Sequence, residues 1–329
     1  MDSLTQLAFG AACGEAILGK KVGRKALIWG AILGTLPDLD VLIPLGSPVD
    51  DFVYHRGFSH SLFLLTALSP VFAWLITKVH GNTKPLFNKW MLLTFVVLNG
   101  SVLLDLFTIY GTQIFWPFDT TPHAIPALFI IDPLFTLPIL IGVSSALFLK
   151  NHRVNFIGLC LSLAYLIWAL GVSVFINGKM EEKLNEQGVP YSQFISSPAP
   201  FTTLLWRTVG IHNDQYFETY YSLFDGDAPL SVNFYPRNLS LMTGMDDLTP
   251  AAKLDKFTRG YFAMSENNES IAMVDLRMGS EPNYVFQFQV GKMNNSQAEA
   301  TSSQRLITKP DWKRLSWLWK RIWDPSTEL

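Results

Sequence analysis

The chain has 329 residues, of which 49% are hydrophobic and only 16% are charged, and its mean hydropathy is positive at +0.23. A soluble globular domain usually carries about 25% charged residues, so this composition is typical of a membrane protein. The net charge of −2 provides no basic surface for nucleic acid, which is therefore excluded as a partner. Residues 1–178 contain 19 charged side chains and the last 151 residues contain 33. This contrast predicts a membrane region followed by a water-exposed region.

Six apolar stretches approach the roughly 20 residues that a helix needs to cross a bilayer. Pro37 interrupts the second stretch, and the first is short. Glycines spaced by four, Gly10 with Gly14 and Gly30 with Gly34, predict close packing between helices. The stretches lie near residues 3–19, 26–45, 60–79, 89–110, 126–149 and 154–177. The predicted fold is an α-helical polytopic membrane domain of about six spans over residues 1–178.

Basic residues in the loops predict how these spans are oriented. Three alternate loops, at residues 20–25, 78–89 and 150–153, hold nearly all the Lys and Arg of the membrane region, whereas the opposite loops hold only Arg56. The positive-inside rule then places both ends of the chain outside the cytoplasm. We expect a multi-pass protein of the bacterial inner membrane with a periplasmic C-terminal domain.

Beyond residue 178 the sequence becomes polar and predicts a small extracytoplasmic α+β domain over residues 179–308. Thr249 and Pro250 suit the start of a helix that would continue to about Met264. Segments rich in β-branched and aromatic residues predict strands at 202–209, 216–223, 271–277 and 284–290.

Residues 309–329 form a separate amphipathic segment. Apolar side chains recur there at helical spacing, at Trp312, Leu315, Trp319 and Ile322. Basic residues lie between them. This pattern predicts a helix that either lies in the membrane interface or docks on the preceding domain.

Acidic and histidine side chains gather at one end of the predicted spans, the end that faces the C-terminal domain. Such groups are costly near hydrocarbon unless they are paired, bound to a metal or hydrated. We therefore expect them to converge at one depth as a functional site, with structural pairing as the alternative. The group consists of Asp2, Asp38, Asp40, His55, His60, Asp105 and Asp132.

The spacing within this group favours a metal site. Because Pro37 disfavours helix in the residue before it, we expect an extended segment with Asp38 and Asp40 on one side. His55 and His60 cannot share one helix face, so we expect His55 on a loop and His60 in the first turn of the third span. Carboxylates with imidazoles suit zinc, manganese or iron better than calcium. The two cysteines lie in apolar runs and form no cysteine zinc site.

The sequence resembles the YdjM-like bacterial inner-membrane proteins, a family associated with metal-dependent hydrolysis. The similar blocks together run over roughly two thirds of the chain. The most specific blocks are GTLPDLD at residues 34–40 and HRGFSHS at residues 55–61. The others are MDSLTQ at 1–6, LLDLFTIYGTQ at 103–113, IIDPLFTLP at 130–138, SPAPFTTLLWR at 197–207 and YYSLFD at 220–225. The resemblance implies that the metal or catalytic set consists of Asp38, Asp40, His55, His60 and Asp105.

Our leading hypothesis assigns roles within this set. Asp38, Asp40, His55 and His60 are the expected ligands of a divalent metal, with zinc favoured and manganese, iron or magnesium as alternatives. Asp105 is expected as a further ligand or general base, and Arg56 as the group that stabilises negative charge in the transition state. Whether Gln6, His123 or Asp132 joins the site is left open.

The predicted function is a membrane-bound metal-dependent hydrolase that acts at the outer membrane–water interface on a lipid or phosphoester substrate. Membrane lipids and an amphiphilic substrate are the expected partners, and the sequence names no protein partner. One alternative is a transporter or ion pathway, because acidic residues within spans and proline-interrupted helices are typical of those proteins. A second is a non-catalytic envelope scaffold whose outer domain binds protein or glycan.

Overall fold

The computed structural model describes the chain except for residues 244, 246–248, 295–296, 309–312 and 328–329. Two compact units make up the fold. The first consists of Met1–Ile43, Arg56–Gly171 and Pro200–Thr202, and the second of Pro44–His55, Val172–Ala199 and Thr203–Leu329. The expected boundary at residue 178 stays a prediction.

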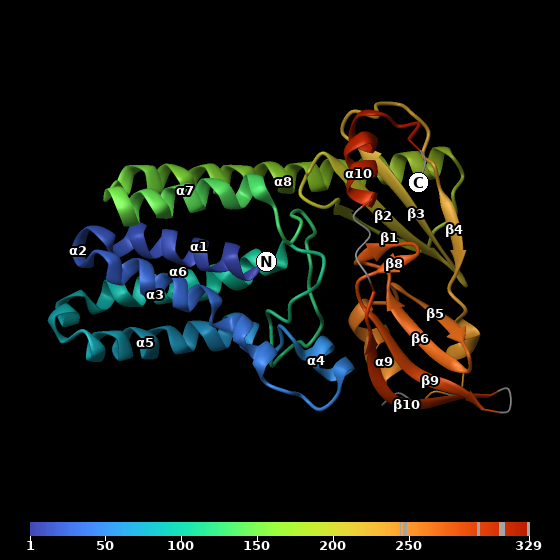
Figure 1. Cartoon of the computed structure of the whole chain (residues 1–329), viewed down its shortest axis with the longest axis horizontal. Helices are drawn as coiled ribbons and strands as arrows, with labels where there is room; N and C mark the ends of the chain where they lie inside the picture. Colours follow the sequence, from blue (N-terminus) through green and yellow to red (C-terminus); the bar gives the residue numbers. More distant parts are fainter. Residues whose placement is uncertain (244, 246–248, 295–296, 309–312, 328–329) are drawn as a thin grey trace. The chain divides into compact units, whose positions relative to one another are not determined.

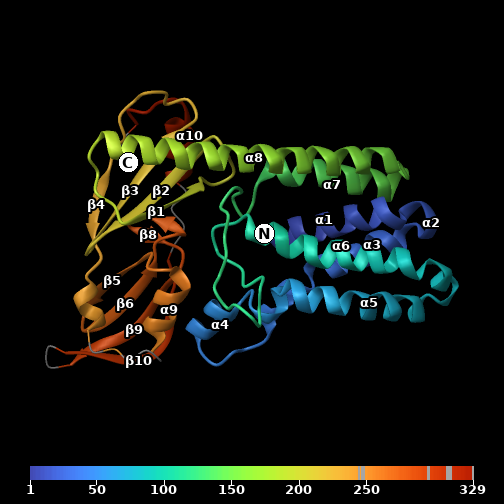
Figure 2. The same ribbon diagram turned by 180° about the vertical axis from the view of Figure 1, so that it is seen from behind.

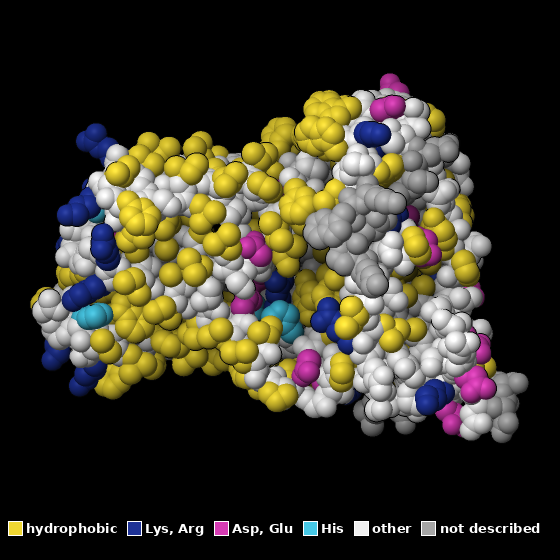
Figure 3. Space-filling view, viewed as in Figure 1, with side chains coloured by type: hydrophobic (Ala, Val, Ile, Leu, Met, Phe, Trp, Pro, Cys, Tyr) yellow, Lys and Arg dark blue, Asp and Glu magenta, His cyan; other side chains and the backbone are white. Residues whose placement is uncertain are grey.

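The first unit is a bundle of helices that run side by side (Figures 1 and 2). Hydrophobic side chains cover most of its visible surface, and Lys and Arg gather at one end (Figure 3). Its α-helices are α1 (Ser3–Gly14), α2 (Lys20–Val22), α3 (Arg24–Thr35), α5 (Leu62–Val79), α6 (Phe87–Leu106), α7 (Pro133–Leu149) and the first part of α8 (His152–Glu186). Between them lie a π-helical turn, η1 (Glu15–Gly19), and the 3₁₀ helices η2 (Pro37–Leu42), η3 (Phe58–His60) and η4 (Gly81–Leu86).

Three helical stretches of the described chain are long and apolar enough to cross a membrane. These are Leu62–Val79, Gly81–Leu106 and His152–Glu186, and Pro133–Leu149 is a shorter apolar helix. They correspond to the last four of the six expected spans. The first two expected spans form the shorter helices α1 and α3, of 12 residues each. An N-terminal helical region with candidate membrane spans is thereby confirmed, whereas the number of six spans stays a prediction.

The predicted glycine contacts are present between α1 and α3. A Cβ atom on Gly10 would lie 2.1 Å from the carbonyl oxygen of Gly30, and one on Gly14 would lie 2.2 Å from that of Ala26. A Cβ on Gly34 would likewise lie 2.5 Å from the carbonyl oxygen of Gln6. The two backbones therefore touch, which fixes η2, the continuation of α3, close to the N-terminal end of α1.

The second unit is rich in β-structure and contains three antiparallel sheets. The first has the order β1-β2-β3-β4, with β1 (Gln193–Pro198), β2 (Leu205–His212), β3 (Gln215–Ser222) and β4 (Asn233–Pro236). The second has the order β10-β9-β6-β5, with β10 (Gln297–Leu306), β9 (Gln287–Asn294), β6 (Ser270–Asp275) and β5 (Phe262–Asn267). The third pairs β7 (Gly279–Ser280) with β8 (Asn283–Tyr284).

Helices complete the second unit. They are α4 (Pro48–Tyr54), η5 (Leu239–Met242), α9 (Pro250–Thr258), α10 (Lys313–Trp323) and the last part of α8. The ring of Phe52 on α4 packs against those of Phe257 on α9 and Phe288 on β9, at 4.9 and 5.1 Å between centroids. Part of the predicted C-terminal helix, residues 309–312 and 328–329, lies outside the described residues.

The structure corrects one predicted element of this unit and confirms four others. The predicted strands correspond to β2, β3, β6 and the β8–β9 region, shifted by a few residues. Thr249 caps α9 as expected, but the helix ends at Thr258 instead of about Met264. Arg259 and Gly260 have φ angles of 58° and 81°, and this left-handed backbone terminates the helix. β5 then begins at Phe262.

Candidate metal centre

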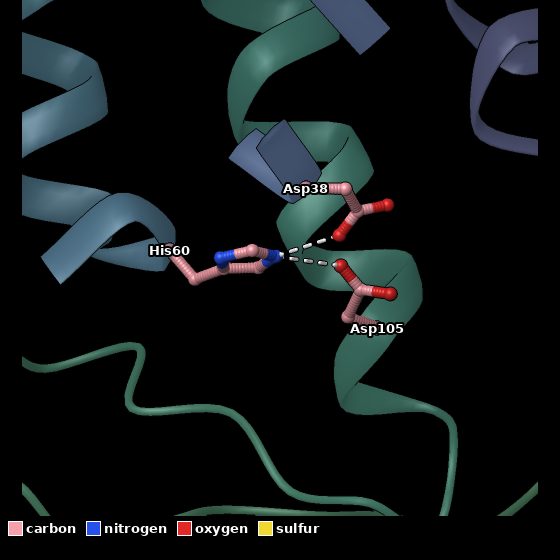
Figure 4. A group of neighbouring side chains, drawn as sticks. All are labelled: Asp38, His60 and Asp105. Carbon is pink, nitrogen blue, oxygen red and sulfur yellow. Dashed lines mark hydrogen bonds and ion pairs between the residues drawn. The ribbon is translucent and has the colours of Figure 1, made fainter. Parts of the chain in front are cut away.

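Three ionisable side chains of the first unit meet in one group: Asp38, His60 and Asp105. Each offers one ligand atom, and these atoms all lie within 4.8 Å of one another. His60 Nε2 lies 3.2 Å from Asp38 Oδ1 and 3.3 Å from Asp105 Oδ2, so one ring nitrogen faces both carboxylates (Figure 4). His60 and Asp105 are fully buried, and Asp38 is partly exposed.

Asp38 is positioned by a helical turn where the sequence predicts an extended segment. That prediction is wrong, because Leu36 before the proline keeps helical angles (φ −58°, ψ −44°) and Pro37 opens the 3₁₀ helix η2. The fixed φ of proline suits the first turn of a helix. With three residues per turn, side chains two apart point about 120° apart. Asp38 and Asp40 therefore do not point the same way.

Asp40 lies on the other side of the His60 ring from Asp38. Its Oδ2 accepts hydrogen bonds from the Arg56 backbone N–H at 3.0 Å and from the Ser59 hydroxyl at 2.6 Å. The Ser59 oxygen lies 2.9 Å from His60 Nδ1, and Asp40 Oδ2 lies 3.8 Å from the same nitrogen. Groups that contact the second nitrogen of a metal-binding histidine orient its ring. In this geometry Asp40 supports His60 and is outside the group of three.

The two histidines of the HRGFSHS block are placed apart. His60 ends η3, and the predicted position in the first turn of the third span is wrong. Ser61 caps α5 through a hydrogen bond from Leu64 N–H, so His60 lies two residues before the first residue of that helix. His55 lies at the C-terminal end of α4, belongs to the second unit and is not part of the group of three.

Arg56 is buried beside Asp105. Its Nη2 lies 3.0 Å from Asp105 Oδ1, its Nη1 donates to the Thr108 hydroxyl at 3.2 Å, and its guanidinium lies over the Tyr110 ring at 5.0 Å. Arg56 has a φ of 62°, an uncommon angle for a residue with a side chain and one that often marks functional sites. Its Nε has no hydrogen-bond partner in the described part of the chain.

Asp105 also receives contacts from the N-terminal end of the bundle. The Met1 nitrogen contacts its carboxylate, and Gln6 Nε2 donates to its Oδ2 at 3.1 Å. Gln6 Oε1 is buried and has no hydrogen-bond partner among the described residues. Gln6 therefore joins the surroundings of the site, a point that the sequence left open. Thr108 and Tyr110 were not predicted, although both lie in the LLDLFTIYGTQ block.

Three other polar residues of the membrane region have local structural partners. Asp2 caps α1 by accepting from Leu4 and Thr5 N–H, and Asp132 caps α7 and accepts from the Tyr165 hydroxyl at 2.9 Å. His123 lies 3.0 Å from Asp119. None of the three belongs to the group of three.

The donor atoms of the group fit a divalent metal. One imidazole nitrogen and two carboxylate oxygens suit zinc, manganese or iron. Ligands at about 2.0–2.1 Å from a tetrahedral ion lie roughly 3.3 Å from one another. The two separations at His60 Nε2, 3.2 and 3.3 Å, match this value. Asp38, His60 and Asp105 could therefore hold a metal ion.

Comparison with known proteins identifies the family of this chain. The family model described as YdjM inner membrane protein matches residues 1–177, which is more than half of the chain. The chain belongs to this family. The group of three lies within the matched residues, and most of the β-rich domain of this YdjM-family protein lies beyond them. No curated protein and no solved structure matches the chain.

Proposed function

We propose that this YdjM-family protein is a membrane-bound hydrolase that uses a divalent metal held by Asp38, His60 and Asp105. The observation that carries the proposal is the burial of these groups together in the membrane unit. Two carboxylates and an imidazole are costly to place there, and ionisable groups retained at such a depth are functional by default. The donor set and the neighbouring guanidinium favour hydrolysis over simple structural pairing.

Each residue has a defined part in this proposal. When bound, a divalent ion supplies an acidified water and polarises a phosphoryl or acyl oxygen. Asp40 and Ser59 hold the His60 ring in place, and Gln6 holds Asp105. Because Asp105 already contacts the Arg56 guanidinium, we assign it as a ligand and not as the general base. Arg56 stabilises negative charge that develops on the substrate.

The position of the site favours an amphiphilic substrate. Asp38 directly follows α3, His60 directly precedes α5, and Asp105 lies in the last turn of α6. At α5 and α6 these ends are opposite the ends joined by η4, where Lys78 lies in α5, Lys84 in η4 and Lys89 in α6. A lipid or lipid-linked phosphoester would present its polar head at this level with its chains among the spans. The positive-inside rule assigns this end to the outer face of the inner membrane.

Hydrolysis is tested with the full chain in detergent, loaded with zinc or manganese. The substrates are phosphomonoesters, phosphodiesters and carboxylic esters, each with a short and a long acyl chain. We expect turnover of a long-chain substrate that falls by at least about 100-fold in His60→Ala, because loss of a ligand removes the charge stabilisation that the ion provides. His123→Ala, which changes the same residue type outside the group, should keep the activity. Absence of turnover in the metal-loaded protein for every bond type would contradict the proposal.

The membrane orientation has its own test. A reporter fused after residue 84, between α5 and α6, should be active only if it is of a type that works in the cytoplasm. The reason is that loops rich in Lys and Arg remain on the cytoplasmic side. Fusions after residue 190, which precedes β1, should be active only as periplasmic reporters. The reverse pattern would place the metal centre at the cytoplasmic face.

A further inference from the structure

The C-terminal helix α10 is docked on the first sheet by one of its faces. Leu318 and Ile322 are buried in a cluster with Ala199, Leu205 and Tyr220. Two polar contacts fix the same face. Arg321 forms a buried ion pair with Asp225, with an Nη2–Oδ2 distance of 2.6 Å, and the Ser222 hydroxyl donates to the Ile322 carbonyl at 2.6 Å. The helix is therefore held rigidly, and the predicted docking on the domain is present.

A neighbouring face of α10, about 100° around the helix, presents large aromatic rings to the surroundings. Trp319 is 63% exposed, and Trp323 and Phe224 are each 55% exposed. The Trp323 ring stacks on Phe224 at 4.9 Å and lies 5.9 Å from the Trp319 ring, so the three rings form one surface, which we call the aromatic patch. Hydrophobic side chains gather beside α10 in Figure 3. Lys320 is exposed next to the patch.

The sheet that carries the patch is built on the extension of a candidate membrane span. Val172, Ile176, Met180 and Leu184, one stripe of α8, are buried in a cluster that includes Trp206 and Phe217 of this sheet. Because successive residues of a strand face opposite sides, Trp206 on β2 packs on α8 while Leu205 packs on α10. The apolar part of α8 is long and apolar enough to cross a membrane, and the chain belongs to an inner-membrane family. The domain therefore follows directly on this candidate span, and the continuous helix α8 tethers it to the membrane region.

We propose that the aromatic patch of Trp319, Trp323 and Phe224 inserts into the interfacial layer of the phospholipid bilayer and holds the C-terminal domain on the membrane surface. Trp is enriched at the headgroup level, where its apolar ring and its polar N–H are both accommodated. The covalent attachment through α8 makes this contact intramolecular in effect, so even weak insertion is populated. Because α10 is docked on the sheet, the rings are already ordered before insertion, and insertion carries little further entropy cost. The inference does not depend on hydrolase activity.

The test uses the full chain in phospholipid nanodiscs that hold one copy each. Cys160→Ser removes the exposed native thiol, while Cys13 stays buried. A fluorophore is then attached either to Lys320→Cys beside the patch or to Glu266→Cys on the exposed part of β5. Lipids with a nitroxide near the headgroup should quench the label at position 320 at least about twofold more than the label at position 266.

Matched variants connect this quenching to the patch. Trp319→Ser combined with Trp323→Ser should remove the difference, while Leu318 and Ile322 keep α10 docked. The control pair is Val285→Ser with Ile307→Ser, which removes two exposed apolar side chains elsewhere in the same domain and should leave the quenching unchanged. If the labels at positions 320 and 266 are quenched equally in the protein that keeps the aromatic patch, the proposal is overturned. No patch variant is needed for this result. Quenching that survives the tryptophan changes also overturns the proposal.

Discussion

Metal analysis of the detergent-purified protein should find about one divalent ion per chain, and His60→Ala should lose that ion. His60 Nε2 faces both carboxylates, so its removal leaves only two protein ligands and removes the imidazole that zinc prefers. Asp38→Asn should have a similar effect, because it keeps the shape of the side chain and removes its charge. The measurement is mass spectrometry of metal content on variants that elute as folded protein.

The His123 and Asp119 pair provides a matched control for this experiment. These side chains have the same chemical types and lie 3.0 Å apart, but both are substantially exposed and outside the group of three. His123→Ala and Asp119→Asn should therefore keep the ion. Asp40→Asn should weaken metal affinity by about 10–100-fold without abolishing binding, as expected for a residue that orients a ligand. A parent protein that stays free of metal after reloading, or an ion retained by both His60→Ala and Asp38→Asn, would contradict the site.

The sequence predicts the centre of this site because buried charge is conspicuous. Asp38, His60 and Asp105 all belong to the group of charged residues at one end of the spans, where the cost of burial makes each of them notable. Gln6, Thr108 and Tyr110 are neutral, and neutral polar residues near helix ends have many structural uses. Only the three-dimensional contacts of Gln6 with Asp105 and of Arg56 with Thr108 and Tyr110 identify them.

Local geometry limits what the spacing of residues can predict. Pro37 is compatible with an extended segment and with a helix start, and the packing of α3 on α1 selects the helix start. In the C-terminal domain, the short strand β4 carries no clear alternation of apolar residues and was not predicted. The end of α9 depends on the left-handed backbone at Arg259, a residue with no special preference for that conformation. Tertiary packing selects the helix start at Pro37, whereas α9 also ends at a local signal, Gly260, that the predicted range to about Met264 overlooks.

Loss of one partner of a buried ion pair in the C-terminal domain should destabilise this domain strongly. Arg207 on β2 and Glu218 on β3 face the same side of the sheet as diagonal neighbours, and both are buried. Arg207 Nη1 also donates to the Leu276 carbonyl at 3.0 Å, which ties β2 to the segment after β6. The Tyr284 hydroxyl donates to the Glu218 carboxylate. The pair therefore connects the first sheet to the segment after β6 and to β8.

Glu218→Ala should lower the free energy of unfolding of this domain by about 3–5 kcal/mol at pH 7, because it leaves the Arg207 charge buried without its partner. Urea unfolding of the full chain in detergent, read out by pulse proteolysis, measures this change. The double variant Arg207→Met with Glu218→Leu removes both charges and should be less destabilised than Glu218→Ala. If Glu218→Ala lowers the free energy of unfolding by less than about 1 kcal/mol, the buried Arg207 charge does not depend on Glu218 as its burial suggests.

The same pair gives the domain a defined acid sensitivity. Burial alone would raise the pKa of Glu218, but the Arg207 guanidinium and the hydrogen bond from Tyr284 outweigh burial and hold this pKa below its usual value. A carboxyl group with a lowered pKa in the folded state binds more protons when unfolded. The contribution of Glu218 to the free energy of unfolding is therefore complete above the pKa of about 4.3 that it has in the unfolded chain. This contribution is lost as the pH falls toward the lower pKa of the folded state. The domain of the parent protein should lose stability below this pH more steeply than the double variant, and equal slopes would contradict the role of the Glu218 carboxylate.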